Sequence, residues 1–172
     1  MTIEPDRKDW TWVLDRPCPE CGFDATALRR DDLPVLVRET AGRWREALAK
    51  DDCAVRPADN IWSPLEYACH VRDVHSVFDE RVRRMLTETD PAFASWDQDV
   101  TAVEERYDEQ DPATVSEELV AAADVVADRY AGVTGDAWER SGRRSDGSVF
   151  TVESIGRYHL HDVVHHLFDV GS

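Results

Sequence analysis

The chain has 172 residues, of which 42% are hydrophobic, so it is long enough to bury a core and has the composition of a globular protein. Its 36 acidic and 20 basic side chains leave a net charge of −16 at pH 7. Because this charge repels phosphate backbones and anionic lipid headgroups, it argues against a nucleic-acid or membrane-surface partner. We therefore expect a small-molecule substrate, and the sequence leaves a homodimer open.

The first ten residues are polar and lack a basic region followed by an apolar run. No apolar segment approaches the ~18 residues that a membrane-spanning helix needs. We therefore expect a cytoplasmic protein, in which thiols stay reduced. The four cysteines are accordingly interpreted as free thiols, core residues or ligands before disulfides are considered; they are Cys18, Cys21, Cys53 and Cys69.

Residues 1–30 are predicted to form an irregular arm, with Trp10 and Trp12 as anchors and a tight turn at residues 17–22. Residues 31–172 are predicted to form one helical domain. Its first helix is expected at about residues 31–50, with acidic residues and a proline in the first turn, where the missing N–H does no harm.

The clearest helix start in the chain is the capping box that begins at Ser63. Ser63 suits the N-cap, Pro64 the first helical position and Glu66 the third. The helix that follows is expected to end before Pro91, and it carries His70 in its second turn.

A shorter acidic helix is predicted at residues 97–107, and a third long helix begins near Pro112. A turn is predicted at residues 143–148, because Asp-Gly accepts positive φ, and the last long helix opens at about residue 151. Few segments alternate with period two. The prediction is therefore an all-α fold, an up-down four-helix bundle, in which metals are often held by side chains from facing helices.

The last helix offers two candidate ligand pairs, His161 with His165 and Asp162 with His166. Residues four apart project from one face of a helix, so either pair can share a divalent ion. The two pairs lie on opposite flanks of the apolar stripe and cannot serve the same ion, and spacing alone does not choose between them. His70 is the best candidate for a third ligand, whereas His75, which has no such partner, is expected to be exposed.

Two motifs resemble those of the DinB-like superfamily. The segment Trp62-Ser-Pro-Leu-Glu-Tyr-Ala-Cys-His70-Val-Arg-Asp73 resembles its second-helix motif, in which a Trp-Ser opening leads to a metal-binding histidine. The segment His161-Asp-Val-Val-His165 resembles its fourth-helix His-x3-His motif. The resemblance spans residues 31–170 and implies a four-helix bundle that holds a divalent metal, zinc or nickel, on three side chains.

Carried over by position, the implied metal ligands are His70, His161 and His165. The thiol-dependent isomerase branch of the family uses Glu-x3-His followed by an Asp. Asp162, His166 and Asp169 resemble that spacing, with Asp in place of Glu. We favour His161 and His165 over this alternative pair.

Characterised relatives include S-transferases and isomerases that use low-molecular-weight thiols such as mycothiol or bacillithiol. Three protein ligands leave an open position on zinc, where a thiol is converted to its nucleophilic thiolate or where water is activated for hydrolysis. The resemblance thus favours a metal-dependent thiol S-transferase acting on small electrophiles. The alternatives are a non-catalytic stress protein that binds a metal or small ligand, and a metal-dependent hydrolase.

The segment Cys18-Pro-Glu-Cys21-Gly22 looks like one knuckle of a zinc ribbon, in which the glycine lets the backbone turn beneath the metal. The chain has no second Cys-x2-Cys, so a four-cysteine site within one subunit is excluded. Three interpretations stay open: a tight turn with ordinary thiols, a redox-active pair, and an arm folded over the bundle so that Cys18 or Cys21 approaches the histidines.

Overall fold

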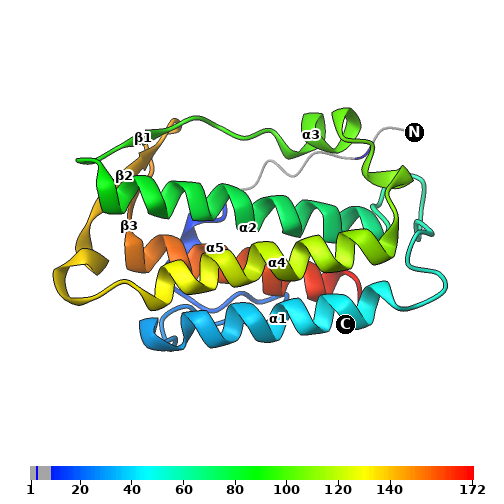
Figure 1. Ribbon diagram of the computed structural model, residues 1–172, viewed down its shortest axis with the longest axis horizontal. Helices are drawn as coiled ribbons and strands as arrows, with labels where there is room; N and C mark the ends of the chain where they lie inside the picture. The colour runs from blue at the N-terminus through cyan, green and yellow to red at the C-terminus, as the bar shows by residue number, and fades with distance from the viewer. Residues whose placement is uncertain (1–2, 4–8) are drawn as a thin grey trace.

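In the computed structural model, which describes residue 3 and residues 9–172, four long helices pack side by side (Figure 1). They are α1 (Leu33–Leu48), α2 (Pro64–Thr87), α4 (Pro112–Ala131) and α5 (Val152–Asp169). The shorter helical elements are η1 (Thr11–Leu14), η2 (Arg30–Asp32), α3 (Gln98–Glu104), η3 (Tyr107–Glu109) and η4 (Gly135–Glu139). The predicted all-α four-helix bundle is confirmed, and none of the described helices has both the length and the apolarity needed to cross a membrane.

Around the bundle the helices follow the order α1, α4, α2, α5. The colours in Figure 1 show that α1 and α5 run in one direction and α2 and α4 in the other. The pair α2 and α4 is parallel because the connection between them, residues 88–111, returns along the length of the bundle past α3. At this connection the bundle differs from strict up-down alternation, and α5 comes to lie between α2 and α1.

The predicted capping box sets the start of α2. The Ser63 side chain accepts a hydrogen bond from the Glu66 amide at 3.2 Å, and the Ser63 amide donates to Glu66 Oε2 at 2.9 Å. Glu66 is 2% exposed, and its carboxylate also accepts from Arg56 Nε at 2.8 Å. Since the cap and Arg56 use this carboxylate, it does not hydrogen-bond to the His70 ring. Glu66 affects His70 only by setting the start of the helix, which places His70 in its second turn.

Helix α5 packs unusually close to α1 and α4 at Gly156. A Cβ atom on this residue would lie 2.8 Å from Leu33 Cδ1 and 3.2 Å from Tyr130 Cε1. Only glycine fits such an approach without displacing its neighbours. This contact lets the first turns of α5 pack closely against α1 and α4.

A small sheet closes one end of the bundle and was not predicted. Strand β1 (Ala92–Phe93) pairs in parallel with β2 (Ser141–Arg144), which pairs antiparallel with β3 (Val149–Thr151). The predicted turn joins β2 to β3, with Gly147 at φ +91°. The sheet brings Arg144 back to the start of α5, where it donates a hydrogen bond to the Tyr158 hydroxyl at 3.3 Å.

The expectation that His75 is exposed was wrong, because its ring is fully buried between α2 and α5. Its Nδ1 lies 2.9 Å from His159 Nε2, and His159 Nδ1 lies 3.1 Å from the Tyr130 hydroxyl. The three side chains form a hydrogen-bonded chain across the core. Burial lowers the pKa of His75 well below its usual value, and burial lowers the pKa of His159 to about 4.

The neutral core histidines predict a loss of stability in mild acid. The pKa of His75 is lower in the folded than in the unfolded chain. Below pH ~6.5 the His75 ring is therefore protonated in the unfolded chain but stays neutral in the folded chain. The free energy of unfolding should then fall by as much as ~1.4 kcal/mol per pH unit for this group. In His75→Asn the amide keeps a polar atom facing His159 but does not titrate. Urea unfolding at pH 7 and pH 5 should show a smaller decrease for the variant, and equal decreases would contradict this account.

Candidate metal centre

Three side chains from α2 and α5 bring potential ligand atoms together: His70, Asp162 and His166. Asp162 Oδ1 lies 3.6 Å from His70 Nε2 and 3.7 Å from His166 Nε2. These distances are too long for hydrogen bonds. They are close to the ~3.4 Å that separates donors ~2.1 Å from a shared ion at tetrahedral angles.

Two of these residues, His70 and Asp162, place buried atoms without hydrogen-bond partners at the cluster. His70 is fully buried, and neither of its ring nitrogens has a hydrogen-bond partner within the described part of the chain. Asp162 Oδ1 is likewise buried and accepts no hydrogen bond from any described residue. A buried polar atom left without a partner costs about 1–3 kcal/mol, so two such residues facing each other fit a site that a cation completes.

The protonation states of the cluster suit metal binding. Burial lowers the pKa of His70, so the ring is neutral at pH 7, which is the form that coordinates metals. Burial alone would raise the pKa of Asp162, but its contact with His70 and the nearby His166 lower it, so the carboxylate is ionised. His166 Nδ1 lies 2.9 Å from Asp169 Oδ2, and this contact leaves Nε2 available to face the cluster.

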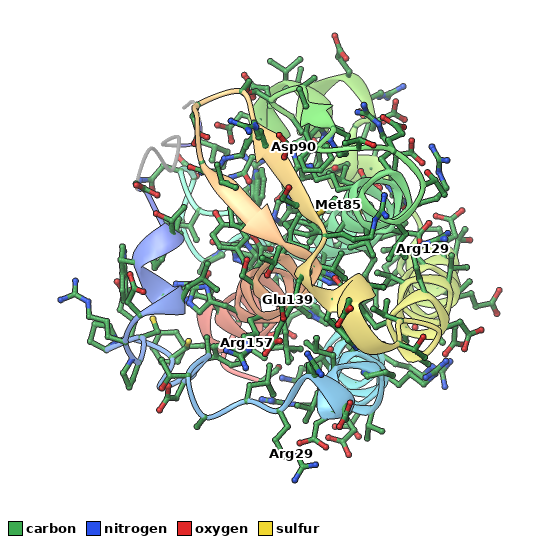
Figure 2. All side chains as sticks on the ribbon, turned by 90° about the vertical axis from the view of Figure 1, so that its left-hand side faces the viewer. Arg29, Met85, Asp90, Arg129, Glu139 and Arg157 are labelled. Carbon is green, nitrogen blue, oxygen red and sulfur yellow. The ribbon has the colours of Figure 1, made fainter. Side chains whose placement is uncertain are left out.

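The structure does not gather the favoured set of His70, His161 and His165 into one such group. It brings His70 to the alternative pair, Asp162 and His166, while His161 and His165 lie with Cys18 and Cys21 of the arm. Successive residues of a helix point about 100° apart, so two pairs offset by one residue face different neighbours. The 162/166 pair faces α2, and the 161/165 pair faces the arm, which Figure 2 shows beside α5 on the side away from α4.

A cavity of about 360 Å³ opens onto the cluster of His70, Asp162 and His166, and His161 and His165 line its arm side. Its walls include aromatic rings from four parts of the chain: Trp10, Phe78, Trp96 and Tyr158. The Trp96 ring stacks on His70 with 5.4 Å between centroids and 3° between planes. The cavity has the size and the mixed apolar and polar lining of a small-molecule site.

Two arginines give this cavity a positive wall, although the chain as a whole is acidic. The Arg81 guanidinium lies over the Phe78 ring at 5.2 Å, and no hydrogen bond or ion pair joins it to another described residue. Arg144 donates to Asp146 Oδ2 at 2.8 Å and also lines the cavity. Burial and the charge of Arg144 lower the pKa of Arg81, and an anionic ligand would offset both effects.

The family model described as the DinB superfamily matches residues 35–168. The chain belongs to the DinB superfamily. Among solved structures, this DinB protein is similar to YfiT from Bacillus subtilis, described as a probable metal-dependent hydrolase with an unusual four-helix bundle topology. The two are 18% identical with a TM-score of 0.69, and the match covers 85% of this chain and 89% of YfiT, a likeness that concerns the fold. No curated protein matches the chain.

Two residues that line the cavity of this DinB protein, Arg81 and Trp96, were not singled out from the sequence. Arg81 lies three turns after His70 on α2, where its charge had no evident use. Trp96 lies just before α3 and reaches His70 only because the connection 88–111 runs back along the bundle. For Asp162 and His166 a signal was present, since Asp169 follows His166 by three residues and contacts its ring.

Proposed function

We propose that this DinB protein is a metal-dependent enzyme that joins a low-molecular-weight thiol, such as mycothiol or bacillithiol, to a small anionic electrophile. The observation that carries the proposal is the meeting of His70, Asp162 and His166 at the wall of a cavity with a positive side. Buried atoms without hydrogen-bond partners, as on His70 and Asp162, next to a space for a small molecule are typical of a catalytic rather than a structural metal site.

The donor set, two imidazoles and one carboxylate, suits zinc or nickel. When bound, such an ion would supply Lewis acidity at an open coordination position, lowering the pKa of a thiol or water there. The residues of the chain hold and orient the donors. Asp169 fixes the His166 ring through Nδ1, and Trp96 covers one face of His70.

A thiol as the nucleophile is favoured by the identity of the α5 pair. Asp162 and His166, followed by Asp169, resemble the spacing of the thiol-dependent branch of the family, and this is the pair that lies beside His70. In the proposed reaction the thiol loses its proton, and its sulfur forms a bond to an electrophilic carbon. Either a leaving group departs with its bonding electrons, or a proton is added to the neighbouring carbon.

The positive wall selects the second substrate. Arg81 and Arg144 would hold a carboxylate or similar anionic group, since a guanidinium binds such groups through paired hydrogen bonds. The aromatic side chains of Trp96 and Phe78 would cover the remainder of a molecule that fits about 360 Å³. We therefore propose that the electrophile is compact and carries at least one negative charge.

A second candidate is hydrolysis, and the observation that favours it is the likeness to YfiT, a probable metal-dependent hydrolase. The two activities differ in their need for a thiol. Metal-free protein would be loaded with zinc or nickel and given a carboxylate-bearing electrophile, with and without a panel of small thiols. The proposal predicts product only when metal and thiol are both present. Turnover without a thiol would identify a hydrolase, and metal binding without turnover on any thiol or ester would indicate a non-catalytic binder.

A further inference from the structure

A second group of potential ligands lies where the arm meets α5. Cys18, Cys21, His161 and His165 each place one donor atom within 4.8 Å of the others. Cys18 Sγ lies 3.7 Å from His165 Nδ1. For two donors that share a tetrahedral zinc ion, with bonds of ~2.3 Å to sulfur and ~2.1 Å to nitrogen, the expected separation is ~3.6 Å.

The arm presents its two sulfurs through a tight turn. The Cys18 amide donates to the Phe23 carbonyl at 2.8 Å, and the Gly22 amide donates to the Cys18 carbonyl at 2.9 Å. Gly22 has φ +75°, a conformation that glycine adopts without strain. The turn folds Cys21 back beside Cys18. The backbone thus fixes the two thiols on one side of the knuckle.

Helix α5 presents its two imidazoles to these sulfurs. His161 is 3% exposed, and its Nε2 has no hydrogen-bond partner among the residues that the structure describes. His165 turns Nδ1 toward Cys18, and its Nε2 lies 3.6 Å from Glu20 Oε2 and 3.8 Å from Asp169 Oδ1. A carboxylate behind the outer nitrogen is the arrangement that orients a metal-binding histidine.

We propose that Cys18, Cys21, His161 and His165 bind a structural zinc ion, separate from the site of His70, Asp162 and His166. Two thiolates and two neutral imidazoles complete the tetrahedral coordination of zinc and leave no open position. The site would therefore stabilise the fold rather than bind substrate. The two thiolates also balance the charge of Zn²⁺, which suits a site with three buried members.

The proposed zinc ion would fasten the arm to α5 and so complete the cavity next to it. The Trp10 ring lies 5.4 Å from the His161 ring and 4.8 Å from the His165 ring, and it lines the cavity on the arm side. Phe23 packs on His161 from the other end of the knuckle, with 5.7 Å between ring centroids. One ion would thereby hold a wall of the neighbouring cavity without taking part in its chemistry.

The test uses Co²⁺ as a probe for the full-length protein, stripped of metal and kept reduced and free of oxygen. Only this site offers sulfur ligands, so only this site should give the near-ultraviolet thiolate-to-cobalt charge-transfer band. We expect the wild type to bind two equivalents of Co²⁺ and to show the band. Cys18→Ser/Cys21→Ser should bind one equivalent without it, and His70→Ala should bind one equivalent with the band intact.

Cys53→Ser is the matched control, because Cys53 is also buried but lies outside the cluster, and it should retain both the band and two equivalents. A wild-type protein without the band, or a band that persists in Cys18→Ser/Cys21→Ser, would overturn the proposal. If the double variant does not fold, the single variant Cys21→Ser, at the half-buried position, should weaken the band. If the site of His70, Asp162 and His166 bound no metal, the metal content would be lower but the band would be unchanged. The two proposals can therefore be refuted independently.

Discussion

His70→Ala is expected to lower turnover by about 100- to 1,000-fold and to remove one equivalent of bound metal, because the variant loses a buried ligand atom that faces Asp162. Asp162→Asn and His166→Ala should reduce turnover and metal content in the same way, since all three donors belong to one group. Turnover and elemental analysis of the purified variants provide the measurement. The variants should retain the helical circular dichroism of the wild type, because the helix caps at Ser63 and Thr151 are untouched.

His161→Ala is the matched comparison, since it also removes a buried imidazole, and His161 is the residue next to Asp162 on α5. This variant should reduce turnover by much less than His70→Ala, because His161 lines the cavity but its ring belongs to the cluster with Cys18 and Cys21 rather than to the one with His70. If His161→Ala proved as damaging as His70→Ala while His166→Ala had no effect, the set of His70, His161 and His165 would be the correct one.

Arg81→Met is expected to raise the KM for a carboxylate-bearing electrophile by about 10- to 100-fold, the range that corresponds to losing one charged hydrogen-bond donor worth about 1.5–3 kcal/mol. Methionine keeps an unbranched apolar side chain but removes the guanidinium that lies over Phe78. The same change should leave the KM for a neutral amide analogue of the electrophile almost unaltered. Steady-state kinetics with the two substrates measures this difference.

Arg83→Met provides the control for charge alone. Arg83 is also on α2, but it is exposed and pairs with Glu80 on the helix surface. The variant should change the KM of neither substrate. Equal increases in KM for the charged and the neutral substrate in Arg81→Met would show that the cavity, rather than the charge, had been disturbed.

The starts of α2, α4 and α5 could be predicted from the sequence because a side chain caps each of them locally, whereas Asp32 before α1 makes no such cap. The hydroxyl of Ser63 and the carboxylate of Glu66 satisfy backbone groups within their own turn, so no distant residue is needed to place His70. The resemblance to the DinB-like superfamily, made on the motifs around His70 and His161, is confirmed by the family match. The parallel arrangement of α2 and α4 could not be predicted, since the capping and periodicity of a helix carry no information about its direction.

Which pair of candidate ligands on α5 faces His70 depends on the rotation of α5 about its axis. The sequence alone does not determine this rotation. Both pairs of α5, at 161/165 and 162/166, were visible from the spacing of four. Which pair faces His70 is decided by the long-range packing of α5 against the other helices, which includes the close approach of Gly156 to Leu33 and Tyr130. A rotation of about 100° would exchange the two pairs.

Two further features of the structure depend on contacts between distant segments. His75 is buried because His159, 84 residues later, offers its ring nitrogen a hydrogen bond, and such a partner cannot be identified from spacing along one helix. Of the three open interpretations of the cysteine knuckle, the arm folded over the bundle corresponds to the observed position of Cys18 beside His165. The local turn of the knuckle could be predicted from the sequence, but its position next to α5 could not.

Crystals of the zinc- or nickel-loaded protein, with diffraction data collected on both sides of the absorption edge of the metal, would locate the ion. We expect an anomalous peak within ~2.0–2.2 Å of His70 Nε2, Asp162 Oδ1 and His166 Nε2. A peak shared by His70, His161 and His165, or no peak beside His70, would contradict this expectation.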